Sequence, residues 1–146
     1  MNDHSPLLAR DYKFFEAAKR AAEGSDFKVR VGAVAVWRRR VIASAASQNK
    51  TKPVQKYWNK FRNFSQDGEC LPKLHAEIAL ISKLKKLDID MRDVSVYVYR
   101  VCKSREKGLA RPCGACLAAL RALGIEKIFY STDCGYAVEV IDKNIG

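Results

Sequence analysis

Pro112-Cys113-Gly114-Ala115-Cys116 and, earlier in the chain, His75-Ala76-Glu77 are the stretches from which the fold and the chemistry of this sequence follow. Each stands at the start of an apolar run with helical spacing. Two thiolates three residues apart in the first turn of a helix lie on one face, and an imidazole from a second helix can supply a third ligand to the same ion. The pattern predicts a zinc site formed by His75, Cys113 and Cys116, with the fourth tetrahedral position open to water.

Glu77 lies two residues beyond the predicted ligand His75. At this spacing its carboxylate can reach a water in the open position of the metal without becoming a ligand, and it can accept and return protons there. A lone histidine is more often a hydrogen-bonded core residue, but the acidic neighbour and the paired cysteines favour the metal. We therefore expect Zn²⁺ as the cofactor and Glu77 as the catalytic residue.

The two stretches together resemble the signature of the zinc-dependent nucleobase deaminases, and both halves are present without substitution. The similarity extends from about Val29 to the C-terminus. It implies hydrolytic deamination, in which the metal lowers the pKa of water, Glu77 transfers protons and ammonia leaves the ring. It also implies that backbone amides near Ala76 and Cys113 orient the base.

The length of 146 residues and the 48% apolar composition predict one domain over residues 1–146 with a core of its own. A net charge of +11 would attract phosphate-bearing partners, although solubility alone would also explain it. Neither a signal peptide nor an apolar run long enough for a bilayer is evident, so we expect a cytoplasmic protein without membrane contact. The cysteine count is odd and two cysteines have metal-ligand spacing, so Cys70, Cys102 and Cys134 are expected to be reduced thiols.

The periodicities predict the order α-β-β-α-β-α-β-β. Helices are expected over 5–23, 74–87 and 113–123, and strands over 29–37, 41–46, 94–101, 125–132 and 136–141. The fold class is α/β, and the resemblance implies a cytidine deaminase-like three-layer α-β-α arrangement with a five-stranded mixed sheet. The short turn between the last two strands makes them a C-terminal antiparallel hairpin.

Particular side chains follow from these elements. Leu8 and Tyr12 are expected on the apolar face of the first helix, and Leu87 on that of the second. Gly32, inside the first strand, is expected to let a substrate or a neighbouring backbone come close.

Two residues near the predicted site are candidates for substrate binding. Asn49 follows the second strand, where the resemblance implies a contact with the sugar hydroxyl of the substrate, while an asparagine in a turn before Pro53 would be an ordinary feature. Arg111 borders the predicted metal mouth and could meet a phosphate, although a solvated charge is the commoner explanation for such a residue.

Residues 52–64 interleave basic and aromatic side chains directly before the helix that begins near His75. Aromatic faces stack on unpaired bases and neighbouring cations meet phosphates, so Trp58 is a further candidate for substrate binding. The aromatic residues also fit one side of a short helix packed on the core, which is the commoner meaning of such a stripe: Tyr57, Trp58, Phe61 and Phe64.

The expected reaction is conversion of cytosine to uracil, because the terminal hairpin resembles the cytidine branch of the family. A cytosine-containing single-stranded nucleic acid is the first substrate hypothesis, supported by the basic charge and the aromatic segment. Free cytidine or deoxycytidine nucleosides or nucleotides are the alternative, and adenosine in tRNA is a weaker one. A non-catalytic zinc domain that binds nucleic acid would leave Glu77 without a role. Because many relatives form oligomers, a homo-oligomer is also expected as a possibility.

Overall fold

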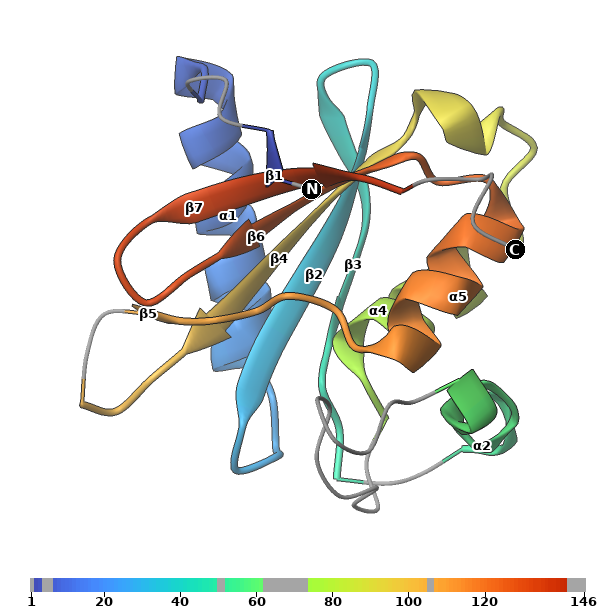
Figure 1. The fold of residues 1–146 in the computed structure, drawn as a ribbon, viewed down its shortest axis with the longest axis horizontal. Coiled ribbons are helices and arrows are strands. Elements are labelled where there is room, and N and C mark those ends of the chain that lie inside the picture. Colours follow the sequence, from blue (N-terminus) through green and yellow to red (C-terminus); the bar gives the residue numbers. More distant parts are fainter. Residues whose placement is uncertain (1, 4–6, 50–51, 62–73, 105–106, 142–146) are drawn as a thin grey trace.

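The structure of the chain is a computed structural model that describes residues 2–3, 7–49, 52–61, 74–104 and 107–141. Its centre is one mixed β-sheet (Figure 1). The five expected strands are present: Arg30–Trp37 (β2), Arg40–Ala46 (β3), Ser95–Val101 (β4), Lys127–Ser131 (β6) and Tyr136–Val140 (β7). Two strands of two residues each, Asn2–Asp3 (β1) and Lys107–Gly108 (β5), extend the sheet beyond the prediction.

The strand order is β1-β7-β6-β4-β2-β3, and β5 pairs with the end of β4. Strands β4 and β6 are parallel, with Ser95 opposite Lys127, because the chain between them crosses over through a helix. Strands β6 and β7 form the expected antiparallel hairpin. Buried Ser131, at the end of β6, joins three strands: its hydroxyl accepts from the backbone N–H of Arg100 at 3.1 Å and donates to the carbonyl of Gly108 at 2.7 Å.

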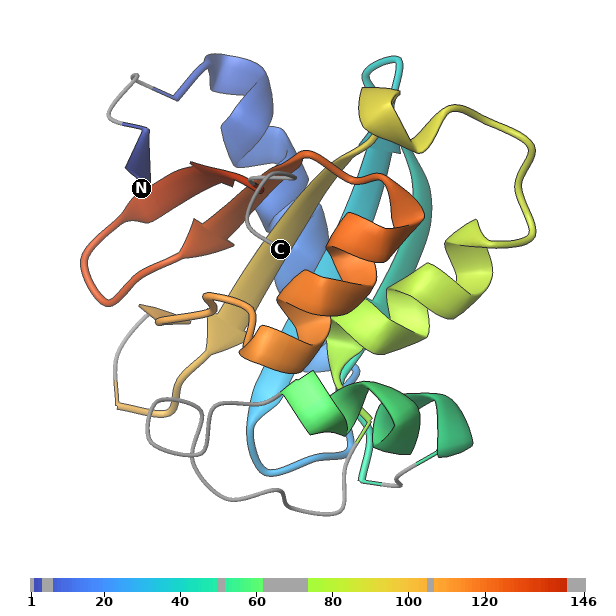
Figure 2. The same ribbon diagram turned by 45° about the vertical axis from the view of Figure 1, so that its right-hand side comes forward.

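Helices cover both faces of the sheet, which confirms the three-layer prediction (Figures 1 and 2). Helix Ala9–Glu23 (α1) lies on one face, whereas Ala76–Leu84 (α4) and Gly114–Leu123 (α5) lie side by side on the other. A short helix, Pro53–Trp58 (α2), continues into the 3₁₀ turn Asn59–Phe61 (η1), and a second 3₁₀ turn, Met91–Asp93 (η2), precedes β4.

The larger core fills the space between the sheet and the α4–α5 layer, with fully buried Ile78, Leu80 and Leu120 at its centre. The smaller core lies under α1 and is largely aromatic. There, Tyr97 stacks on Phe129 with ring centroids 4.3 Å apart, and Phe15 stacks on Tyr136 at 4.1 Å. Of the metal-ligand candidates, Cys116 belongs to the larger core and Cys113 packs against it.

Gly32 of β2 permits the close approach of α1. A Cβ atom at this position would lie 2.2 Å from the carbonyl oxygen of Ala18 and 2.3 Å from the backbone nitrogen of Ala22. The prediction of a close backbone is therefore confirmed, and the neighbour is helix α1.

The N-terminal end of α1 differs from the prediction. The helix begins at Ala9, because the Asp11 carboxylate accepts a hydrogen bond of 2.8 Å from the backbone N–H of Leu8 and so fixes Leu8 as the residue before the helix. The expected burial of Leu8 is wrong, since its side chain is 51% exposed. Tyr12 is also half exposed and packs edge-on against Tyr136, with ring centroids 5.7 Å apart.

Helix α4 is shorter than predicted at both ends. It stops at Leu84, and the backbone N–H of Leu87 bonds to the Leu84 carbonyl at 2.9 Å in a tighter turn. This turn leaves Leu87 40% exposed, so its expected place in the core is wrong. Leu74 is buried as expected, but in an isolated antiparallel bridge with Gln48. None of the helices in the described residues is both long enough and apolar enough to traverse a bilayer.

Candidate metal centre

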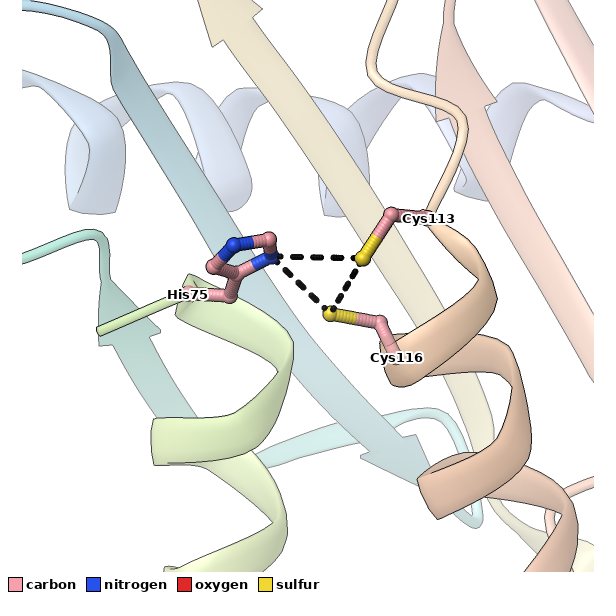
Figure 3. Close-up of side chains that lie close together, drawn as sticks. All are labelled: His75, Cys113 and Cys116. Atoms are coloured by element: carbon pink, nitrogen blue, oxygen red, sulfur yellow. Dashed lines mark hydrogen bonds between the residues drawn. The ribbon is translucent and has the colours of Figure 1, made fainter. Parts of the chain in front are cut away.

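The two predicted motifs meet where α4 and α5 begin. His75 is the residue that precedes the first turn of α4, and Cys113 holds the same position before α5. Both have extended backbone angles, so they belong to the helix caps, one position before the first turns in which they were expected. Cys116 lies in the first turn of α5. Because the two helices lie side by side, their N-terminal ends bring the three side chains together (Figure 3).

The separations of the three ligand atoms fit a zinc ion. The sulfurs of Cys113 and Cys116 lie 3.7 Å apart, and Nδ1 of His75 lies 3.6 Å from the Cys113 sulfur and 3.2 Å from the Cys116 sulfur. With Zn–S of ~2.3 Å and Zn–N of ~2.0 Å, tetrahedral geometry puts two sulfurs ~3.8 Å apart and a sulfur and a nitrogen ~3.5 Å apart. Among the described residues these three form a cluster able to hold a metal ion.

The surroundings favour the thiolate, which is the form of cysteine that binds metals. The pKa of the Cys113 thiol is lowered to about 4, mainly by the hydrogen bond with the Cys116 thiol and further by His75, while burial acts in the opposite direction. The Cys116 side chain is fully buried. Three ligands from the protein also leave one tetrahedral position for a reactant, as in catalytic rather than structural zinc sites.

Glu77 lies in the first turn of α4, and only 4% of its surface is exposed. An acidic residue is rarely buried in a protein unless it is paired or serves a site. Its position next to the N-terminal end of the helix suits a carboxylate, because the helix dipole favours negative charge there. The burial agrees with a carboxylate that serves the metal centre, and its catalytic role remains a prediction.

Gln55 is a site residue that the sequence analysis did not single out. Its side chain is fully buried, and its Oε1 accepts a 2.8 Å hydrogen bond from the backbone N–H of His75. Its Nε2 donates to Oδ1 of Asn59 at 2.8 Å. Gln55 thereby ties α2 to the residue that precedes α4. The sequence signal was weak, because a glutamine between Lys and Val neighbours in a basic segment is typical of a solvated surface.

Asn49 follows a residue that is bridged to the segment before the metal ligand His75. Its neighbour Gln48 exchanges two backbone hydrogen bonds of 2.9 Å with Leu74, the residue before His75. Asn49 is exposed, and its backbone N–H donates to the Asp26 carboxylate at 3.0 Å. The contact of the Asn49 side chain with substrate stays a prediction.

Trp58 and Arg111 make contacts within the protein. Trp58 packs partly buried against the larger core and meets Tyr57 edge-on, with ring centroids 5.0 Å apart. The guanidinium of Arg111 bonds to the Glu139 carboxylate of β7, at 2.8 Å through Nε and 3.2 Å through Nη2. Arg111 therefore fastens the segment before α5 to the sheet, and the contacts of both residues with substrate stay predictions.

Cys102 and Cys134 are free thiols, as expected, and neither belongs to the metal cluster. Cys70 and Phe64 lie outside the described residues, as does the whole of segment 62–73. Ala76 is fully buried at the start of α4, where its backbone N–H is one of the helix-end donors without an acceptor four residues earlier in the helix.

Comparison with known proteins places this geometry in context. Residues 8–132 match the family described as the cytidine and deoxycytidylate deaminase zinc-binding region. No curated protein sequence matches the chain. Solved structures share its fold. A cytidine deaminase from Burkholderia pseudomallei is 17% identical, with a TM-score of 0.62 over 92% of this chain and 94% of its own.

The dCMP deaminase from the cyanophage S-TIM5 is a second structural relative. In its apo form it is 16% identical, with a TM-score of 0.59 over 87% of this chain and 86% of its own. Its complex with dCMP and dUMP has a TM-score of 0.58 at 16% identity, over 86% and 83% of the two chains. At these identities the likeness is one of fold.

Proposed function

The chain belongs to the cytidine and deoxycytidylate deaminase family, and from this premise we propose that it removes the exocyclic amino group of cytosine in a free nucleotide or nucleoside. Water adds to the amino-bearing ring carbon, the carbon–nitrogen bond breaks, and ammonia leaves a uracil ring. The observation that carries the proposal is the arrangement of His75, Cys113 and Cys116 at two adjacent helix starts, with the buried Glu77 two residues away from a ligand.

His75, Cys113 and Cys116 would hold the zinc ion, which, when bound, acts as a Lewis acid and makes water nucleophilic near neutral pH. The Glu77 carboxylate would accept a proton from the attacking water and deliver it to the ring nitrogen of the base. The carboxylate of Glu77 would then take the second proton from the added hydroxyl and pass it to the amino group, which leaves as ammonia. Burial of Glu77 limits competition from bulk water for these protons.

Backbone and side-chain groups near the cap of α4 would orient the base. The N–H of Ala76 belongs to the set of helix-end donors and can bond to a carbonyl oxygen of the substrate. Asn49, which is exposed beside the Gln48–Leu74 bridge, would bind a sugar hydroxyl. Gln55 accepts a hydrogen bond from the backbone N–H of His75. It would therefore hold this metal ligand and the neighbouring N–H of Ala76 in fixed positions relative to each other.

The names of the structural relatives support cytosine and a small substrate, since one is a cytidine deaminase and the other a dCMP deaminase solved with dCMP and dUMP. A single-stranded nucleic acid is the second candidate, and one feature favours it. Tyr57 and Phe61 are 58% and 45% exposed, and Nζ of Lys60 lies 4.1 Å and 5.3 Å from their ring centroids. Exposed rings beside a cation can stack on bases and meet a phosphate.

The test is a deamination assay of zinc-loaded protein, with Glu77→Gln as the inactive control. The substrates are cytidine, deoxycytidine and their monophosphates, beside single-stranded DNA and RNA that contain cytosine or adenine. We expect uracil products from a monomer, and Glu77→Gln to retain zinc and fold while turnover falls by at least ~100-fold. Normal turnover by Glu77→Gln would refute the assigned mechanism, and turnover of strands alone would replace the nucleotide with the second candidate.

A further inference from the structure

A cavity of about 460 Å³ lies at the end of the sheet opposite the metal centre. Its lining includes Val36 near the end of β2 and the first residues of two parallel strands, Ser95 of β4 and Lys127 of β6. The metal ligands lie in segments that come after the C-terminal ends of strands β3 and β4, at the opposite end of the sheet. The floor of the cavity, with Tyr97 and Phe129, belongs to the core under α1, whereas the metal centre lies on the α4–α5 face. The two sites are therefore separate.

Four cationic side chains line this cavity, and we refer to them as the rim cations: Arg10, Arg38, Arg39 and Lys127. All four are exposed. Within the described part of the chain, none of them forms an ion pair with a carboxylate, and the ion pairs found there join other residues. Unneutralised positive charges around a concave surface focus the electrostatic potential and attract anions.

The two acidic residues in the lining, Asp11 and Asp93, offset only half of this charge: four cations less two carboxylates leave a net charge of +2. Asp11 is buried, and its carboxylate accepts a 2.6 Å hydrogen bond from the Tyr97 hydroxyl and a 2.8 Å bond from the backbone N–H of Leu8, so it is held in place and not directed at a rim cation. Asp93 is exposed to solvent. The cavity also lies at the N-terminal end of α1, whose dipole adds to the positive potential.

The hairpin that carries two of the rim cations has a backbone unfavourable to arginine. Arg38 and Arg39 form the two-residue turn between β2 and β3, with φ of +50° and +64°. Such turns strongly favour asparagine and glycine, because side chains with a Cβ are strained at positive φ. The Arg38 guanidinium lies 4.3 Å from the centroid of the Trp37 ring, which helps to hold it in place. Local stability therefore does not account for arginine at both positions, and strain of this kind often marks a site of function.

We propose that this cavity binds a small polyphosphate anion, with its phosphate groups on the rim cations and any organic part against the apolar floor. Guanidinium groups bind phosphate oxygens in pairs of charge-assisted hydrogen bonds, and three of the four rim cations are arginines. The volume lies in the range of small-molecule sites. A half-open cavity confined to one end of a sheet suits a free anion better than a strand, which needs a continuous groove.

The experiment is a calorimetric titration of zinc-loaded protein with inorganic pyrophosphate, with the zinc content of the protein measured before and after. The decisive variant is Arg38→Asn with Arg39→Gly, because it removes two rim charges while it gives the turn its preferred residues. We expect this variant to be at least as stable to heat as the original protein, and to bind pyrophosphate roughly tenfold more weakly or worse.

Lys85→Gln with Lys86→Gln is the matched control, because it removes two exposed charges after α4 and away from the cavity lining. We expect this control to change pyrophosphate affinity less than about twofold. Equal affinity in the hairpin variant, or an equal loss in the control, would overturn the proposal. A titration with a short single-stranded oligonucleotide distinguishes the source of the phosphate: binding of the oligonucleotide without binding of pyrophosphate would overturn it as well.

Discussion

At the scale of single residues, the metal centre depends on side chains that begin two helices. His75 and Cys113 occupy cap positions, and Cys116 is fully buried behind them. Both cap residues have extended backbone angles, and the adjacent helix starts bring their ligand atoms together. Their separations already match those around tetrahedral zinc.

Cys116→Ser therefore tests whether this thiol binds the metal. We expect zinc content to fall from about one ion per chain to a small fraction, because the hydroxyl does not ionise as a thiol does. Loss of the ion should also remove the stabilisation that binding gives to the folded state. Zinc analysis by atomic emission and a thermal melt would measure both. Cys134→Ser, at an exposed position outside the cluster, should leave both unchanged.

Gln55→Leu tests whether the buried amide fixes the metal ligand. The substitution keeps a similar volume and removes the bonds to the backbone N–H of His75 and to Asn59. We expect a loss of about 1–3 kcal/mol in the free energy of unfolding and faster release of zinc to a chelator, because the partly buried N–H of His75 loses its acceptor. Urea unfolding and a colorimetric chelator measure these quantities. Lys56→Leu, the same replacement at the exposed neighbour, is the control and should change neither.

At the scale of elements, the close contact between β2 and α1 can be tested at Gly32. A Cβ there would collide with backbone atoms of Ala18 and Ala22, which cannot move without displacing the helix. We expect Gly32→Ala to lower the free energy of unfolding by roughly 2–4 kcal/mol, as measured by urea denaturation. Gly135→Ala is the matched control, because the nearest heavy atom outside its neighbours lies 3.9 Å away. A small effect at Gly32 would contradict the packing described here.

The elements that the sequence predicted well are those with a strong pattern. The β2–β3 hairpin and strand β4 are correct to within one residue at each end, because alternating or continuous apolar runs specify buried strands. Strands β1 and β5 were missed, since two residues carry no periodicity and their pairing depends on neighbours in the sheet. Leu87 continued the helical pattern of α4, but the helix had ended at Leu84 and the next turn directed the chain away.

The same reasoning explains what was predicted of the site. His75, Cys113 and Cys116 could be found because metal ligands need particular side chains at particular spacings, and the structure brings them together. Gln55 could not be found, because its role comes from a tertiary contact between α2 and the start of α4. The pairing of Arg111 with Glu139 joins positions 28 apart in the sequence, and no local pattern indicates it.

At the scale of the whole molecule, the net charge of +11 raises the local concentration of any anionic substrate. This attraction acts on a mononucleotide and on a nucleic acid strand alike, so charge alone does not choose between them. The number of phosphates that contact the protein does differ, and it determines how steeply binding weakens with salt. Salt dependence therefore reports the size of the substrate.

We predict a shallow salt dependence of kcat/KM. For a strand, the logarithm of the binding constant falls with a slope of roughly −0.7 per neutralised phosphate, so between about 50 and 200 mM salt one contact costs about threefold and four contacts about fiftyfold. A mononucleotide should therefore lose about threefold over this range. The measurement is the initial rate at low substrate concentration across the series, with the uncharged nucleoside as the control for salt effects on the enzyme. A loss near fiftyfold with an oligonucleotide substrate would instead support a strand held by several phosphates along the exposed rings of Tyr57 and Phe61.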